Sequence, residues 1–169
     1  MLTHLSVRHF ATVDALELEP GKGLTVISGE TGAGKSIIMD ALGLTLGERA
    51  DASAVRAGCE RAEVQATFDI RDCADARQWL AERELDADDE CILRRTVRND
   101  GRSRAYINGS PVPVADVRAL GDFLINIHSQ HEHQSLLKKD TQRSLLDSYA
   151  GAGANADAVR QHWRQWQKA

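Results

Sequence analysis

The chain has 169 residues, of which 42% are apolar and 27% are charged, and its formal net charge is −4. This composition is that of an ordinary soluble domain with enough apolar material for a core, and it excludes a protein that coats nucleic acid through overall positive charge. No stretch reaches the ~18 apolar residues of a membrane span, and the N-terminus lacks a signal-peptide pattern, so we expect a cytoplasmic protein with no membrane partner. The three cysteines form no C-x-x-C pair, and we expect them to be reduced thiols.

The first half of the chain predicts strand, strand, strand and helix. Residues Leu2–Phe10 and Ala15–Glu19 alternate apolar with polar side chains, which is typical of two paired strands. After the turn of residues 20–23, the apolar run Leu24–Ile27 favours a strand that is buried on both faces. Apolar residues at helical spacing then predict a helix over Ile37–Leu46.

The middle of the chain predicts an antiparallel meander. Clusters of Asn, Asp and Gly at residues 99–101 and 108–109 lie between strand-like runs, and such clusters are strong hairpin signals. The predicted strands here are Glu63–Ile70, Cys91–Arg98 and Arg102–Asn108, with a short helix at Ala74–Glu84 between the first two.

The last part of the chain predicts a helix, a strand and two more helices. Val114–Leu120 and Gln142–Tyr149 have helical patterns, and the apolar run Phe123–Ile127 between them predicts a strand. After Gly151 and Gly153, residues Ala156, Val159, Trp163 and Trp166 follow a 3, 4, 3 spacing. This seam is either the start of a coiled coil or an amphipathic helix that caps the domain, because fewer than two heptads are present.

A phosphate-binding loop is the most specific motif of the sequence. Residues 29–36 match G-x-x-x-x-G-K-[ST] at every position and lie between the predicted buried strand and helix. Glycines let the backbone curl around a phosphate, and the helix that follows offers N–H groups without internal partners. Lys35 adds a charge for the β- and γ-phosphates, and the hydroxyl of Ser36 is a ligand suited to Mg²⁺. We therefore expect the chain to bind ATP with Mg²⁺.

The surroundings of this loop resemble the RecN family of bacterial DNA-repair ATPases, which is grouped with SMC-like proteins whose heads are of the ABC type. The resemblance lies in residues 24–49, in Ile107-Asn108-Gly109 and in residues 127–137, and it extends over most of residues 1–149. It implies a role in recombinational repair of double-strand breaks and in the SOS response, with a nucleoid-associated location. The implied fold is α/β, the N-terminal half of a P-loop NTPase head with an antiparallel β subdomain over residues 1–150. Residues 151–169 would be a helical tail that begins a coiled-coil arm.

The resemblance also implies roles for single residues. Gln130 corresponds to the Q-loop glutamine that contacts Mg²⁺ and the attacking water, with Gln134 as a weaker candidate, and an amide suits both tasks. Arg56 resembles an arginine that reaches toward phosphate or DNA, and residues 8–11 resemble a segment near the nucleotide base. Lys35 and Gln130 are the implied catalytic residues, and Ser36 and Gln130 the implied Mg²⁺ ligands. The implied nucleotide-binding residues are Gly29, Glu30, Thr31, Gly32, Ala33, Gly34, Lys35, Ser36, Ile37 and Arg56.

The sequence departs from a complete ABC head in three respects. It contains no signature motif of the L-S-G-G type, no Walker B strand that ends in Asp-Glu and no switch histidine after Gln134. We therefore expect a half-head that hydrolyses ATP negligibly by itself. Its expected partners are the C-terminal half of the head, a second head in a homodimer, and DNA through the assembly.

Several alternatives remain open on the residues alone. His128, His131 and His133 have a spacing that can bind Zn²⁺. Trp163 and Trp166 are a ligand platform or, in the simpler interpretation, packing residues of the seam. The predicted hairpin carries five arginines that either meet DNA phosphates or form a solvated surface on opposite sides of the strands, namely Arg94, Arg95, Arg98, Arg102 and Arg104. A small P-loop kinase and a non-catalytic nucleotide-dependent assembly module are the alternative functions.

Overall fold

The structure is a computed structural model that describes residues 1–28, 33–125 and 139–167. Contacts between residues divide the chain into two units, Met1–Ile127 and His128–Ala169. The described residues of the first unit form a six-stranded sheet with helices on it, and those of the second unit form the helices α5 (Lys139–Tyr149) and α6 (Gly153–Trp166).

The sheet has the strand order β2-β1-β3-β4-β5-β6, and every neighbouring pair is antiparallel. The predicted meander of β4, β5 and β6 is confirmed. The strands are β1 (Leu2–Phe10), β2 (Val13–Leu18), β3 (Arg61–Asp69), β4 (Glu90–Arg98), β5 (Ser103–Ile107) and β6 (Ser110–Val112).

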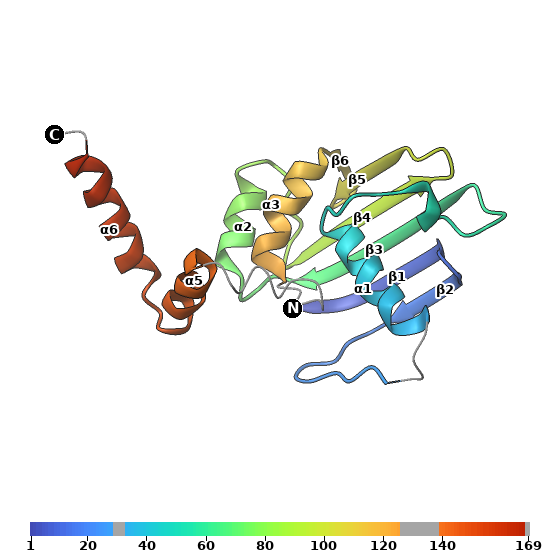
Figure 1. Ribbon diagram of the computed structural model, residues 1–169, viewed down its shortest axis with the longest axis horizontal. Helices are drawn as coiled ribbons and strands as arrows, with labels where there is room; N and C mark the ends of the chain where they lie inside the picture. The colour runs from blue at the N-terminus through green and yellow to red at the C-terminus, as the bar shows by residue number, and fades with distance from the viewer. Residues whose placement is uncertain (29–32, 126–138, 168–169) are drawn as a thin grey trace. The chain divides into compact units, whose positions relative to one another are not determined.

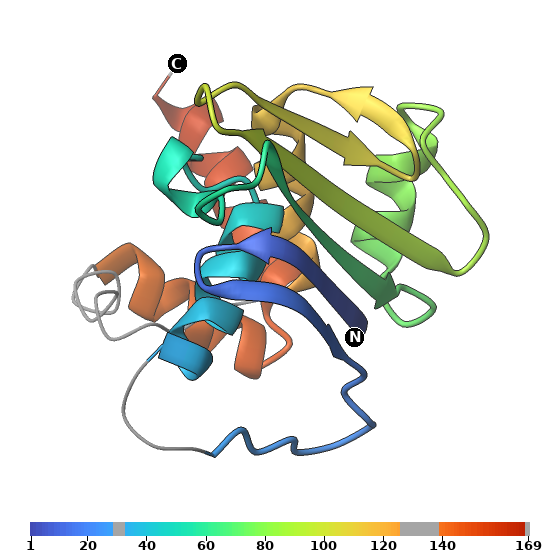
Figure 2. The same cartoon turned by 90° about the vertical axis from the view of Figure 1, so that its right-hand side faces the viewer.

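Three helices cover one face of this sheet, as Figures 1 and 2 show: α1 (Ala33–Thr45), α2 (Ala74–Ala81) and α3 (Val114–Leu124). A short 3₁₀ turn, η1 (Ala52–Ala54), follows α1. The side chains that alternate inward along the strands, such as Leu5, Val64 and Leu93, are fully buried against these helices. Burial of each such side chain contributes about 1.5–3 kcal/mol. The opposite face of the sheet carries the polar and charged side chains, and we call it the outer face.

The predicted buried strand at Leu24–Ile27 is not present in this structure. No β-strand is assigned to it, and Leu24 and Val26 are 91% and 76% exposed. A strand that is apolar on both faces needs neighbours that pair with its backbone and cover its side chains. The edges of the described sheet, β2 and β6, do not pair with this segment.

The predicted strand at Phe123–Ile127 is wrong for its first two residues, which are the last turn of α3. Val117, Leu120 and Gly121 are buried and Leu124 packs against the core, so the helical spacing of apolar residues continues through this run. Ile125 is extended, and residues 126–127 lie outside the described residues.

In the described residues of the second unit, α5 (Lys139–Tyr149) and α6 (Gly153–Trp166) contact each other. Gly151 has φ +63° and the N–H of Ala152 bonds to the carbonyl of Asp147 at 2.8 Å, so the glycine ends α5 as predicted. Gly153, by contrast, is the first residue of α6. Helix α6 has no buried residue, and Trp163 and Trp166 on its seam are 54% and 75% exposed.

Candidate nucleotide-binding site

The end of the predicted phosphate loop forms the first turn of α1. Helix α1 begins at Ala33, so Gly34, Lys35 and Ser36 lie in its first turn. Gly34 and Ser36 are exposed, and Lys35 is half-buried. The first four residues of the loop, Gly29, Glu30, Thr31 and Gly32, lie outside the described residues.

This first turn is suited to an anion. It contains no acidic residue, so no carboxylate of the turn neutralises the partial positive charge of the helix N-terminus. A Cβ atom built on Gly34 would meet nothing within 4 Å, which leaves room above the backbone. Ile37 is buried and follows directly, so the turn is anchored to the core immediately behind its exposed surface.

The other end of α1 is fixed to α3. Gly47 has φ +93°, and the N–H groups of Gly47 and Glu48 bond to the carbonyls of Leu44 and Gly43 at 3.3 and 3.0 Å. This is the Schellman pattern, which requires a left-handed residue and therefore favours glycine. Arg118 of α3 donates from Nη2 to the carbonyl of Gly47 at 2.9 Å. The orientation of α1, and hence of its first turn, is thus set at both ends.

The structure brings together two segments to which the family resemblance gave separate roles, residues 8–11 and Arg56. His9 at the end of β1 and Ala11 in the turn to β2 both have positive φ, and this corner pairs with the chain around Arg56. The N–H of Arg56 bonds to the carbonyl of His9, and the N–H of Ala11 to the carbonyl of Ala54, each at 2.8 Å.

Asp14 is the central acidic residue of this cluster, and sequence reasoning missed it. Its Oδ1 lies 2.6 Å from Nη1 of Arg56 and 3.8 Å from Nε2 of His9. No hydrogen bond or ion pair joins Arg56 to the first turn of α1 within the described part of the chain. The only sequence signal was an acidic residue four positions after Phe10, at the start of a strand, and such residues are common.

Three other predictions concern residues that the structure does not describe. Gln130, Gln134 and the three histidines at positions 128, 131 and 133 all lie outside the described residues. Within residues 1–28, 33–125 and 139–167, no group of three or more His, Cys, Asp or Glu residues is arranged to hold a metal ion. None of the helices in these ranges is both long and apolar enough to cross a membrane.

The predicted hairpin arginines divide between the two faces of the sheet. Arg94, Arg98, Arg102 and Arg104 line one pocket of the outer face. Arg95 alone points to the opposite face, where it is 2% exposed, and burial lowers its pKa. Its Nε and Nη1 atoms have no hydrogen-bond partner among the described residues. The hypothesis that all five meet DNA is therefore wrong for Arg95.

The sequence was compared with protein-family models and with curated proteins. The family model described as "AAA domain" matches residues 4–165. The DNA repair protein RecN of Vibrio cholerae is 52% identical over 169 residues, which cover 100% of this chain and 30% of that protein. RecN of Xylella fastidiosa (strain Temecula1) is 53% identical over 167 residues, which cover 99% and 30%. The chain thus spans less than a third of the length of these curated relatives.

The fold also agrees with solved structures. The Smc head domain with a coiled coil and joint from Pyrococcus yayanosii has a TM-score of 0.72 and 25% identity, and the match covers 99% of this chain and 35% of that one. The predicted α/β head-type fold is therefore confirmed. Because the family model spans most of its residues, this chain belongs to the AAA domain family, and it matches the N-terminal part of bacterial RecN proteins within it.

Proposed function

We propose that this chain is the ATP-binding part of a RecN-like protein that acts in recombinational repair of DNA double-strand breaks. The observation that carries the proposal is a complete phosphate-loop sequence that ends in the first turn of α1, in a chain 52% identical to a DNA repair protein. The relatives do not favour the kinase or the assembly module. The wholly antiparallel sheet also argues against a small kinase, for which we expect a parallel sheet.

The residues of the loop would divide the work of holding MgATP. Backbone N–H groups of residues 29–36 would bind the phosphates, and the Lys35 ammonium would neutralise charge on the β- and γ-phosphates. The Ser36 hydroxyl and the amide oxygen of Gln130 would be protein ligands of Mg²⁺, which when bound draws charge from the phosphate oxygens. Gln130 would also orient water. Residues 8–11 would lie near the base of the nucleotide, and Arg56, which pairs with this segment, would reach toward phosphate.

We also propose that the site is completed by parts outside this chain. The segment Leu24–Ile27 is apolar and exposed here, as expected for a strand whose neighbours belong to a C-terminal half of the head. A second copy of the head would close over the nucleotide, and the exposed seam of α6 would continue as a coiled-coil arm. Because the sequence contains no Walker B carboxylate, the chain alone would hydrolyse ATP at far below the ~1 s⁻¹ of ordinary enzymes.

Calorimetric titration with MgATP tests the nucleotide proposal. A hydrogen bond to a charged group is worth about 1.5–3 kcal/mol, so Lys35→Ala should weaken binding by roughly 10- to 100-fold. Lys22→Ala, which removes an exposed lysine in the turn after β2, is the matched control and should leave the affinity unchanged. Equal affinities of the parent and Lys35→Ala, with both folded by circular dichroism, would remove the loop from the nucleotide site.

A further inference from the structure

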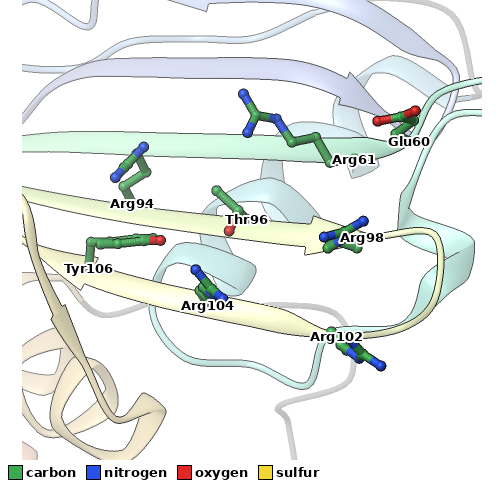
Figure 3. A pocket seen from close by; sticks show the side chains of 8 residues that line it. All are labelled: Glu60, Arg61, Arg94, Thr96, Arg98, Arg102, Arg104 and Tyr106. Carbon is green, nitrogen blue, oxygen red and sulfur yellow. The ribbon is translucent and has the colours of Figure 1, made fainter.

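Five arginines gather on the outer face of the sheet, on the side away from α1, α2 and α3. They come from three neighbouring strands and the hairpin that joins two of them. Together with Glu60, Thr96 and Tyr106 they line a pocket of about 380 Å³. Figure 3 shows their side chains on one side of the ribbon, over β3, β4 and β5. The five are Arg61, Arg94, Arg98, Arg102 and Arg104.

The antiparallel register explains why these side chains share a face. Arg61 of β3 is the partner of Arg98 of β4, and Thr96 of β4 is the partner of Arg104 of β5. Partners in register point to the same side of a sheet, and the residues that alternate with them, such as Val97 and Ala105, are buried in the core. The sequence pattern of this region therefore separates an apolar inner face from a basic outer face.

The charge of this surface is not cancelled by its own acidic residues. Glu63 lies 3.8 Å from Nη1 of Arg94, and Asp100 lies 3.9 and 3.6 Å from Arg98 and Arg102. Glu60 is the one acidic residue among those that line the pocket in the described structure. Five arginines against three carboxylates leave a local charge of +2 on a chain whose net charge is −4. The surface is thus a local basic patch of the kind that can attract a polyanion.

This arrangement costs stability rather than adding to it. Like charges directly opposite each other on neighbouring strands repel, and Arg61 and Arg98 are such a pair. Both side chains are exposed, so packing does not require a large basic residue at either position. An anion bound between them would relieve the repulsion.

Two further groups suit the patch to a phosphate-bearing ligand. The guanidinium of Arg94 lies over the ring of Tyr106, 4.1 Å from its centroid, and this stacking holds the arginine in place for fork-like contacts to phosphate oxygens. Thr96 lies between Glu63 of β3 and Arg104 of β5 in the register, and its hydroxyl adds a neutral donor.

The dimensions favour a chain of phosphates over a single one. Residues 94 and 98 are four positions apart on β4, which places their Cα atoms about 13 Å apart at the usual rise of a strand. A single phosphate would cover only part of this length, whereas a duplex carries one phosphate per about 3.4 Å of each strand. We propose that this outer-face arginine patch binds the phosphodiester backbone of duplex DNA without reading its sequence. The patch is separate from the phosphate loop, so the two proposals can fail independently.

Fluorescence anisotropy with a labelled duplex of about 20 base pairs, measured on the whole chain between about 50 and 200 mM salt, tests the proposal. The test variant combines Arg98→Ala with Arg104→Ala. The matched control removes the same charge from the helical side of the sheet by combining Arg77→Ala, in α2, with Arg83→Ala, just after it. A third variant with Arg98→Lys and Arg104→Lys keeps the charge.

We expect the parent to bind with log K falling linearly against log salt. Loss of two phosphate contacts should make the slope less steep by about 1.8 and weaken binding at the lowest salt by at least about tenfold. The control and the lysine variant should retain most of the affinity, and Lys35→Ala should bind DNA like the parent. If the test variant unfolds in the CD control, the pair Arg61→Ala and Arg102→Ala replaces it.

Three results would overturn the proposal. One is a parent that does not bind the duplex at the lowest salt or binds without salt dependence. Another is an equal loss of affinity in the test and control variants. The third is polyglutamate binding as tightly as DNA with the same dependence on Arg98 and Arg104, since the ligand class would then be an acidic peptide.

Discussion

Asn108 joins the turn between β5 and β6 to two other parts of the chain. Its Oδ1 accepts from the N–H of Ile92 on β4 at 2.7 Å, and its Nδ2 donates to the carbonyl of Leu85 at 2.7 Å. Its own φ is +48°, and Gly109 follows with φ +85°, which is the backbone of a two-residue type I′ hairpin. Asn is one of the few residues with a Cβ atom that tolerate this conformation.

The loss of folding stability expected for Asn108→Ala follows from these contacts. The substitution leaves one N–H and one carbonyl without partners, and in a half-buried place each costs about 1 kcal/mol. A left-handed alanine adds about 1 kcal/mol, so we expect a total loss of about 3 kcal/mol. Asn108→Gly removes the same hydrogen bonds without the backbone penalty and should cost about 1 kcal/mol less. Asn108→Asp keeps the acceptor for Ile92 and loses only the donor to Leu85.

Urea unfolding followed by circular dichroism measures these differences, and a loss of 3 kcal/mol corresponds to a fall in Tm of roughly 6–12 °C for a chain of this size. Asn99→Ala in the β4–β5 hairpin is the control, because no side-chain hydrogen bond is formed by Asn99 in the described structure and its φ is not positive. Its effect should be within about 0.5 kcal/mol. The reasoning fails if Asn108→Ala is no worse than Asn99→Ala, or if Ala and Gly at position 108 are equally stable.

Three further predictions concern the packing around Gly47 and the burial of Cys91. Gly47→Ala places a Cβ atom 3.1 Å from Cβ of Arg118 at φ +93°. It should lower the free energy of unfolding by more than the roughly 1 kcal/mol expected for Gly58→Ala, where φ is +86° but nothing lies within 4 Å of the added atom. Equal urea midpoints of the two variants would contradict the crowding at Gly47. Burial raises the pKa of the Cys91 thiol to about 12, against about 8.5 in an unfolded chain. Its contribution to stability is therefore complete below about pH 8.5 and declines as pH rises toward 12, and Cys91→Ala should flatten that part of the stability curve. At pH 8 a thiol reagent should modify the half-buried Cys59 and Cys73 but reach Cys91 only after urea is added.

The sheet could be predicted from the sequence because its signals are local. The clusters at residues 99–101 and 108–109 set the two hairpins, and Gly101 and Asn108-Gly109 indeed have the positive φ values that such turns require. The period-two alternation of β4, and of β3 as far as Ala66, then determined which side chains are buried. The function of Asn108 as a link to Leu85 could not be predicted, because it depends on a contact 23 positions away.

The prediction errors arise where a local pattern depends on distant partners. At Phe123 and Leu124 an apolar run suggested a strand, but α3 needed one more turn to cover the core, so tertiary packing outweighed local composition. Asp14 could not be connected with Arg56 because 42 positions separate them and neither belongs to a spaced motif. Among the hairpin arginines, the alternation of β4 alone placed Arg95 on the inner face, opposite Arg94.

Whether the run Leu24–Ile27 forms a buried strand depends on the residues that surround it. If its neighbours belong to a C-terminal half of the head, Leu24→Ser combined with Val26→Ser should change the stability of this chain by less than about 0.5 kcal/mol per position, because both side chains are exposed. In a longer protein that carries the remaining part of the relatives, the same substitutions would remove buried apolar surface and should cost about 1.5–3 kcal/mol each. The test compares the urea midpoints of this chain and of the longer protein, each with and without the two substitutions. Equal small effects in both contexts would mean that the run is a surface loop, and a large loss in the short chain would mean that this chain already buries it.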